Sequence, residues 1–165
     1  MKDRKINIAL AGTANVGKSV IFNHLTGLHQ HIGNWPGKTV EKAEGTLHYK
    51  GYTIDVLDLP GIRSLSTYSL EELITREYIV SNHPDFIANI LDANKLETNL
   101  TLTLQLLELE KPMILVLNMA DLLKKNGIAL DLIKLETILG IPAIATSARY
   151  GKGLAECLDR GITSI

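Results

Sequence analysis

The segment over residues 12–19 reads G-T-A-N-V-G-K-S and directly follows the apolar run over residues 6–11. It matches the pattern G-x-x-x-x-G-K-[ST], whose glycines let backbone N–H groups surround phosphates while the next helix directs its positive end at them. The pattern requires a buried strand before the loop and a helix after it, so it predicts a strand over residues 6–11 and a helix over residues 18–25. Chance produces this pattern in roughly one chain of this length in a few hundred, so a glycine-rich turn without a ligand is the weaker interpretation.

Individual residues of this loop have expected roles. Lys18 is expected to reach the β- and γ-phosphates of a nucleotide, and the Ser19 hydroxyl is expected to bind Mg²⁺. The other residues expected to line the nucleotide site here are Gly12, Asn15, Val16, Gly17 and Val20.

Composition excludes several classes of protein. The 165 residues suffice for one domain with a core, and 45% hydrophobic with 21% charged residues is typical of a soluble globular chain. A net charge of −1 offers no basic field for nucleic acid or an anionic membrane surface. The longest apolar stretch, residues 113–117, is far short of the roughly 20 residues that cross a bilayer. Cys157 is the only cysteine, so we expect no internal disulfide, a small apolar role for this residue and a cytoplasmic protein.

Apolar runs bounded by turn signals alternate with stretches of helical period, which indicates an α/β domain with a mostly parallel sheet. Further strands are predicted over residues 39–48, 52–57, 86–91, 113–117 and 143–145, and the turn at residues 49–51 makes the first two an antiparallel hairpin. Further helices are predicted from a capping box at Ser69 and Glu72 to about residue 80, over residues 131–139 and over residues 153–161. We therefore expect one domain over residues 1–165, with a six-stranded, mostly parallel sheet, one antiparallel edge strand and about five helices.

Residues 100–109 carry two competing periodicities. The sequence L-T-L-T-L alternates as a strand does. Leu96, Leu100, Leu104 and Leu107, however, fall at helical spacing, and two parallel strands need a crossover between them. Length and topology favour a helix.

The sequence D-L-P-G over residues 58–61 follows the strand predicted over residues 52–57. Asp58, at the carboxyl end of that strand, is placed to orient Mg²⁺ through water. Gly61 can offer its backbone N–H to a γ-phosphate because no side chain blocks the approach. Alone this sequence is a common turn, but after a phosphate-binding loop it indicates a second part of the same site.

Two further motifs at strand ends predict guanine as the base. In N-M-A-D over residues 118–121, Asp121 can accept from guanine N1–H and the exocyclic amino group, and Asn118 can brace the phosphate loop. In T-S-A over residues 146–148, the Ala148 backbone N–H is expected to face guanine O6, with Met119 and Ser147 beside the base. N-x-x-D alone is typical of a helix cap, but three motifs at successive strand ends, where open α/β sheets bind ligands, favour a guanine nucleotide.

These motifs, in this order, resemble those of the Ras-like P-loop GTPase superfamily over nearly the whole chain. Three segments are similar to the ferrous-iron transport protein B (FeoB) family: G-N-W-P-G-K-T-V-E-K over residues 33–42, D-L-P-G-I-R-S-L-S over 58–66 and L-T-L-Q-L-L-E-L over 102–109. The first is the most specific. The resemblance implies a Ras-like fold that binds GTP and GDP with Mg²⁺ and hydrolyses GTP slowly. It also implies a mobile switch I at about residues 33–39 and a mobile switch II at about residues 61–69.

The resemblance assigns further roles to residues of the loops. Thr39 would close over the nucleotide, ligate Mg²⁺ and touch the γ-phosphate; a threonine after a Pro-Gly turn also fits a loop that reorders, and a threonine that only begins a strand is the weaker interpretation. Asn15 resembles the asparagine with which potassium-activated relatives hold K⁺, and the carbonyls of Gly33 and Trp35 would complete that shell. A brace within the loop is an equally open role for Asn15. The residues expected to carry catalysis are Lys18, Thr39, Gly61 and Asn15.

The chain departs from the pattern of these relatives at two positions. Ala14 replaces a frequent proline, which loosens the loop without removing a ligand. Ile62 stands where Ras-like proteins carry a water-positioning glutamine, so turnover is expected on the order of 10⁻³ per second or less without an activator. Potassium would then supply charge that an arginine finger supplies elsewhere. Arg63 is interpreted as a solvated residue rather than such a finger, and His29 and His31 as exposed rather than an iron site.

The leading hypothesis is a regulatory G domain that couples its nucleotide state to ferrous-iron uptake by a membrane protein. The family's membrane-spanning part and the helical segment that usually follows the G domain are not in this sequence. If the chain is part of a longer protein, we expect it to contact the iron permease segment of that chain at the cytoplasmic face of the membrane. An RNA- or ribosome-associated GTPase of the potassium-activated class is the alternative, disfavoured by the neutral charge. Asn118 and Asp121 argue against a third hypothesis, a P-loop ATPase or small kinase.

Overall fold

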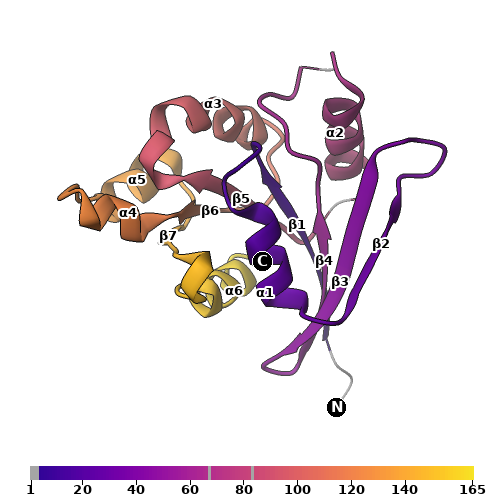
Figure 1. Cartoon of the computed structure of the whole chain (residues 1–165), viewed down its shortest axis with the longest axis horizontal. Coiled ribbons are helices and arrows are strands. Elements are labelled where there is room, and N and C mark those ends of the chain that lie inside the picture. Colours follow the sequence, from indigo (N-terminus) through magenta and orange to yellow (C-terminus); the bar gives the residue numbers. More distant parts are fainter. Residues whose placement is uncertain (1–3, 67, 83) are drawn as a thin grey trace.

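The structure is a computed structural model and describes residues 4–66, 68–82 and 84–165. Within these residues seven strands form one sheet in the order β2-β3-β4-β1-β5-β6-β7 (Figure 1). The strands are β1 (Arg4–Gly12), β2 (Gln30–Asn34), β3 (Glu41–Tyr49), β4 (Tyr52–Asp58), β5 (Phe86–Asp92), β6 (Met113–Asn118) and β7 (Ala143–Ala145). Neighbouring strands from β4 to β7 are parallel, whereas β3 pairs antiparallel with both β4 and β2.

Helices cover both faces of this sheet. They are α1 (Lys18–Thr26), α2 (Leu70–Asn82), α3 (Leu96–Leu107), α4 (Ala120–Lys125), α5 (Leu132–Leu139) and α6 (Leu154–Thr163), with short 3₁₀ turns η1 (Ala93–Lys95) and η2 (Ala148–Tyr150). Helices α1 and α6 pack on one face, and α2, α3 and α5 pack on the other.

Successive side chains of the central strands point to opposite faces of the sheet and so pack into two core layers, one on each face. In β1, Ile8 and Leu10 pack with α1 and α6, whereas Ala9 and Ala11 pack with α2 and α3. Strand β5 is buried along its whole length, as expected for a parallel strand covered on both faces. Each fully buried isoleucine or leucine contributes roughly 1.5–3 kcal/mol, so these layers hold the loops at the strand ends in place.

The predicted α/β fold with a mostly parallel sheet and an antiparallel edge is confirmed. The expectation of six strands was wrong by one, because β2 joins the sheet outside β3 and becomes the edge. Its sequence Q-H-I-G-N carries no apolar alternation, and its strand conformation comes with pairing to β3, from Gln30 opposite Gly45 to Asn34 opposite Glu41. Within the described residues α4 raises the number of α-helices to six, and its six residues were too few to show a period.

Two local predictions, a helix and its capping box, agree with the structure, and one strand boundary differs. Residues 96–107 form a helix rather than a strand, so topology was the right guide there. The capping box at the start of α2 is present: Glu72 N donates to Ser69 Oγ (3.1 Å), and Ser69 N donates to Glu72 Oε2 (3.4 Å). The strand predicted to start at residue 39 starts instead at Glu41, because Thr39 lies in the turn that joins β2 to β3.

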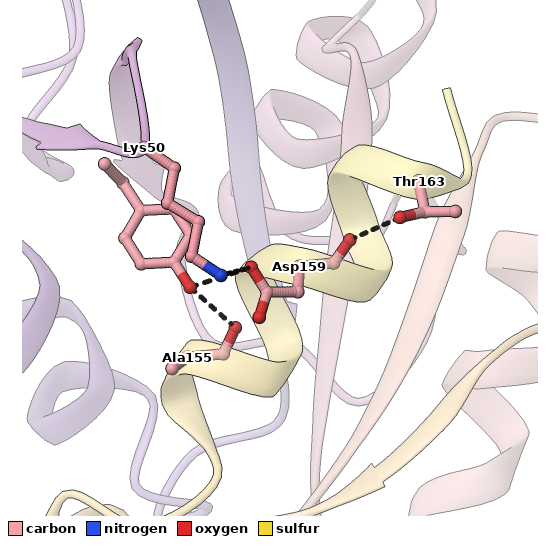
Figure 2. Close-up of polar contacts among 5 residues, drawn as sticks. Lys50, Ala155, Asp159 and Thr163 are labelled. Atoms are coloured by element: carbon pink, nitrogen blue, oxygen red, sulfur yellow. Dashed lines mark hydrogen bonds and ion pairs between the residues drawn. The ribbon is translucent and has the colours of Figure 1, made fainter.

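The turn between β3 and β4 is attached to α6. Lys50 and Gly51 have φ values of 45° and 79°, as a two-residue hairpin turn requires. Figure 2 shows Lys50 and Asp159 pointing toward one another: Lys50 Nζ and Tyr49 Oη donate to Asp159 Oδ1 over 2.9 and 2.8 Å. These hydrogen bonds lower the pKa of the Asp159 carboxyl below its ordinary value. The hairpin is therefore tied to the last helix at neutral pH.

Two further findings concern composition. Cys157 lies on the buried face of α6, and burial raises the pKa of its thiol to about 12, which fits the expected role of an apolar filler. In the part of the chain that the structure describes, no helix has the length and apolar character needed to span a membrane.

Candidate nucleotide-binding site

The phosphate-binding loop joins β1 to α1, in the strand–loop–helix context that the motif predicts. Asn15 (φ 65°) and Gly17 (φ 86°) are both in the left-handed region, which turns backbone groups toward the inside of the loop. A Cβ atom at Gly17 would lie 2.2 Å from Asn118 Nδ2, and one at Gly12 would lie 2.6 Å from the Ile90 carbonyl oxygen. The two glycines are therefore required by close packing against β5 and β6.

Asn118 connects three loops at the carboxyl edge of the sheet. Its Nδ2 donates to the Val16 carbonyl (2.9 Å), while its Oδ1 accepts from Thr146 Oγ1 (3.0 Å) and Ala148 N (3.0 Å). The side chain is buried, with 3% of Asn118 exposed. The expected brace from Asn118 to the phosphate loop is thus present.

The residues predicted to read the base lie together. Ser147 Oγ donates to Asp121 Oδ1 (3.0 Å) and accepts from Asp121 N (3.2 Å), so the carboxylate is oriented by its neighbour. Asp121 is itself exposed. It lines a cavity of about 220 Å³ together with Gly17, Val20, Asn118, Met119, Leu122, Ser147, Ala148 and Arg149.

Ala148 differs from its expected arrangement. Its N–H donates to Asn118 Oδ1 in this structure, and Ala148 is 1% exposed. A contact from this N–H to guanine O6 remains a prediction, and it would require this hydrogen bond to be exchanged or shared.

A second cavity of about 370 Å³ adjoins the first at Gly17 and Val20. It is lined by Thr13, Ala14, Asn15, Gly17, Lys18, Ser19, Val20 and Gly61. Gly61 lies against the loop, because a Cβ there would be 3.3 Å from Ala14 N, and Ile62 N donates to the Gly12 carbonyl (3.1 Å). The second motif, D-x-x-G, is therefore beside the phosphate loop, as the sequence predicts.

Lys18, which lines this cavity, forms a largely buried ion pair with Asp58. Lys18 Nζ contacts Asp58 Oδ1 and donates to the Leu59 carbonyl (2.6 Å). Burial raises the pKa of the Asp58 carboxyl, and the charge and hydrogen bond of Lys18 oppose that rise. The next residue, Ser19, is exposed and lines the same cavity as Lys18, so a hydroxyl of the kind that binds hard cations is accessible there.

The structure does not bring the predicted switch I residues to the phosphate loop. Thr39 lies in the turn of the β2–β3 hairpin, and Figure 1 shows this hairpin at the far edge of the sheet. Trp35 is packed edge-on against Tyr78 of α2, with ring centroids 5.9 Å apart, and its carbonyl accepts from Lys38 N (2.9 Å). The proposed roles of Thr39, Gly33 and Trp35 in metal binding remain predictions that need this hairpin to rearrange.

The described part of switch II is held by Gln105 and Arg76, which the sequence did not single out, and by Glu72 of the capping box; Thr67 lies outside the described residues. Leu65 N donates to Gln105 Oε1 (2.7 Å), and the Leu65 carbonyl accepts from Arg76 Nη1 (3.2 Å). Glu72 Oε2 accepts from Ser66 Oγ (2.7 Å), which lowers the pKa of the Glu72 carboxyl. Gln105 lies in the segment over residues 102–109 that resembles the family, and this resemblance was the one sequence signal that could have identified it.

Three other side chains discussed above do not line the phosphate cavity. Ile62 is 5% exposed and packs in the core between the sheet, α2 and α3, so it does not face the phosphate cavity. His29 and His31 are both exposed. Around them and elsewhere in the described residues, no group of three or more histidine, cysteine, aspartate or glutamate side chains is arranged to hold a metal ion.

Known proteins resemble the chain over almost its full length. A family model described as ferrous iron transport protein B matches residues 6–160. An Fe(2+) transport protein A/Fe(2+) transporter FeoB fusion protein from Porphyromonas gingivalis is 46% identical over 155 residues, covering 93% of this chain and 18% of the relative. The chain spans about a fifth of the length of the curated relatives it matches, 18% and 20% in two examples.

Solved structures of similar proteins agree with this fold. The cytosolic domain of the T. maritima FeoB iron transporter in its GMPPNP form superposes with a TM-score of 0.93 at 44% identity, covering 96% of this chain and 63% of that one. The FeoB G-domain from Methanococcus jannaschii has a TM-score of 0.83 at 44% identity and covers 97% of this chain and 96% of that one.

Proposed function

This chain belongs to the ferrous iron transport protein B family as its G domain, and we propose that it binds GTP and GDP with Mg²⁺ and hydrolyses GTP slowly. The observation that carries the proposal is the buried Asn118 side chain, which joins the phosphate loop at Val16 to the base loop at Ala148. The two adjoining cavities, of about 370 and 220 Å³, match a ligand with a polyphosphate at one end and a base at the other. Relatives solved in GDP and GMPPNP forms support the choice of nucleotide.

The phosphates would lie over the start of α1. Backbone N–H groups of the loop and the Lys18 ammonium would bind the β- and γ-phosphates, and Lys18 would exchange its present contact with Asp58 for them. Mg²⁺ would be held by Ser19 and, through water, by Asp58, with Thr39 added when switch I closes. Bound there, the ion would neutralise charge that develops on the phosphates. The Gly61 N–H would reach the γ-phosphate from the other side.

Turnover is expected to be slow because the side chain after Gly61 cannot orient water. Ile62 is apolar and packed in the core, so it offers no hydrogen-bond partner to an attacking water molecule. K⁺ held by Asn15, with the Gly33 and Trp35 carbonyls, would compensate by placing positive charge beside the phosphates. Asn15 is exposed and lines the phosphate cavity, which supports this role.

In the whole protein we propose that this domain regulates ferrous-iron transport. The curated relatives are named as Fe(2+) transporters and are about five times longer than this chain, which supports a membrane permease segment in the same polypeptide. The domain would then lie at the cytoplasmic face of the membrane. The near-neutral charge gives no reason to expect a nucleic-acid partner.

The nucleotide proposal is tested by titrating fluorescent GDP and fluorescent ADP into the protein in the presence of Mg²⁺. We expect GDP to bind at least about 100-fold more tightly, because ADP leaves the Asp121 carboxylate without its donors. Comparable affinities for the two nucleotides would contradict guanine recognition.

The potassium proposal is tested by measuring GTP turnover in KCl and in NaCl at equal ionic strength, for the wild type and for Asn15→Ala. We expect faster turnover in KCl for the wild type and equal rates in both salts for the variant. Equal, slow rates for the wild type would make Asn15 a brace of the loop and would leave an activating protein as the source of the missing charge.

A further inference from the structure

We propose that Asn94 is a positioning residue that sets guanine selectivity and nucleotide release by holding the loop of Met119 and Asp121. This inference rests on the proposed binding of guanine nucleotide at that loop. Asn94 lies on η1, outside the four motifs, and is 25 residues away from the carbonyl it contacts.

The loop needs an external restraint because its backbone is unusual at Met119. This residue has φ 60° and ψ 31°, a left-handed conformation that side chains other than glycine rarely adopt. Such a conformation persists where surrounding contacts over-determine it. The Met119 carbonyl accepts two hydrogen bonds, one from Leu122 N (3.2 Å) and one from Asn94 Nδ2 (3.1 Å). The first lies within the loop and α4, whereas the second ties the loop to another element.

Asn94 is itself oriented by a buried frame. Asp92 Oδ1 accepts from both Asn94 N (2.9 Å) and Asn94 Nδ2 (3.0 Å), and Asp92 N donates to Asn99 Oδ1 (2.9 Å). Asp92 and Asn99 are each 7% exposed, and Asp92 lies opposite Asn118 in the pairing of β5 with β6. The hydrogen bonds thus run from the end of β5 through Asn94 to the loop that carries Asp121.

The loop that carries Asp121 is held by hydrogen bonds to two neighbouring loops. Ser147 orients the carboxylate itself, and Ala120 N donates to the Thr146 carbonyl (3.0 Å), so the far side of the loop is tied to the base motif after β7. Asn94 provides the tie on the β5 side. Asn94 is exposed, so removing its side chain leaves the core intact while freeing the Met119 peptide.

The test compares Asn94→Ala and Asn94→Asp with Lys95→Ala, a control in the same 3₁₀ turn. For each protein we would measure the release rate of fluorescent GDP and the ratio of the dissociation constants for IDP and GDP. IDP lacks the exocyclic amino group that Asp121 is proposed to accept, so this ratio reports the position of the carboxylate. Asn94→Asp keeps the size of the side chain but replaces the donor to Met119 with an oxygen.

We expect GDP release about 3- to 10-fold faster in Asn94→Ala, at least as fast in Asn94→Asp, and unchanged in Lys95→Ala. The IDP/GDP ratio should fall in both Asn94 variants, because a displaced carboxylate discriminates less. Wild-type values in the Asn94 variants, or equal weakening of IDP and GDP, would overturn the inference. Failure of the wild type itself to prefer GDP over ADP is a different result, and would contradict the proposed function instead.

Discussion

Replacing Asp121 with asparagine is expected to exchange the base preference of the site from guanine to xanthine. The carboxylate accepts two hydrogen bonds from guanine, whereas an amide presents one acceptor and one donor. Xanthine has a carbonyl oxygen where guanine has its amino group, so the amide nitrogen would donate to it. Because an unpaired donor in a fitted site is penalised heavily, we expect GDP affinity to fall by at least about 100-fold while XDP affinity rises.

The geometry makes this exchange feasible without refolding. Asp121 is exposed at the start of α4, and Ser147 Oγ donates to its Oδ1, which an asparagine oxygen can replace. The measurement is a titration of fluorescent GDP and XDP into both proteins. Asp131→Asn is a matched control, because Asp131 Oδ1 caps α5 at Lys134 N (2.9 Å) and an asparagine oxygen caps as well. Unchanged GDP affinity in Asp121→Asn would mean that the base lies elsewhere.

Replacing Asn118 with alanine is expected to destabilise the fold and remove nucleotide binding together. The change leaves three buried groups without their partner: the Val16 carbonyl, the Thr146 hydroxyl and the Ala148 N–H. Each such group costs about 1–3 kcal/mol, so we expect the free energy of unfolding to fall by at least about 3 kcal/mol. Domains of ordinary stability have about 5–15 kcal/mol in total, so a large part of the stability would be lost.

Thermal unfolding followed by circular dichroism measures this loss, with an expected decrease of roughly 10 °C in the midpoint. Asn126→Ala is the control, since Asn126 is exposed at the end of α4 and its hydrogen bonds in the structure are made by its backbone. We expect the control to change stability by less than about 0.5 kcal/mol. A midpoint within two or so degrees of the wild type for Asn118→Ala would show that water replaces the lost side chain.

Much of the site was accessible from the sequence because its parts are short and contiguous. The phosphate loop needs its glycines within a few residues of Lys18, so spacing alone predicted the strand, the loop and the helix. One general property gave the correct positions of three more residues: the carboxyl ends of parallel strands meet at one edge of the sheet, where Asp58, Asn118 and Thr146 lie. The sequence alone also showed that Ile62 cannot orient water, because its side chain has no hydrogen-bonding group.

The tertiary structure decided what depends on partners distant in the chain. Strand β2 exists through pairing with β3, so its own residues carried no signal. Trp35 packs against Tyr78, and Leu65 is held by Gln105 and Arg76, which set the switch segments in arrangements that no local pattern predicts.

The same division applies at the base pocket. The residue types of N-x-x-D indicated guanine, because hydrogen-bonding capacity belongs to the side chain itself. Which groups those side chains actually bind was decided by packing: Ala148 N donates to Asn118, and Asn94 donates to Met119. By itself, then, the sequence determined the kind of fold and the chemistry of the ligand, since both follow from local spacing and functional groups. The arrangement of the switches and of the loop around Asp121 came only with the tertiary structure, because the hydrogen bonds and contacts that hold them join residues far apart in the chain.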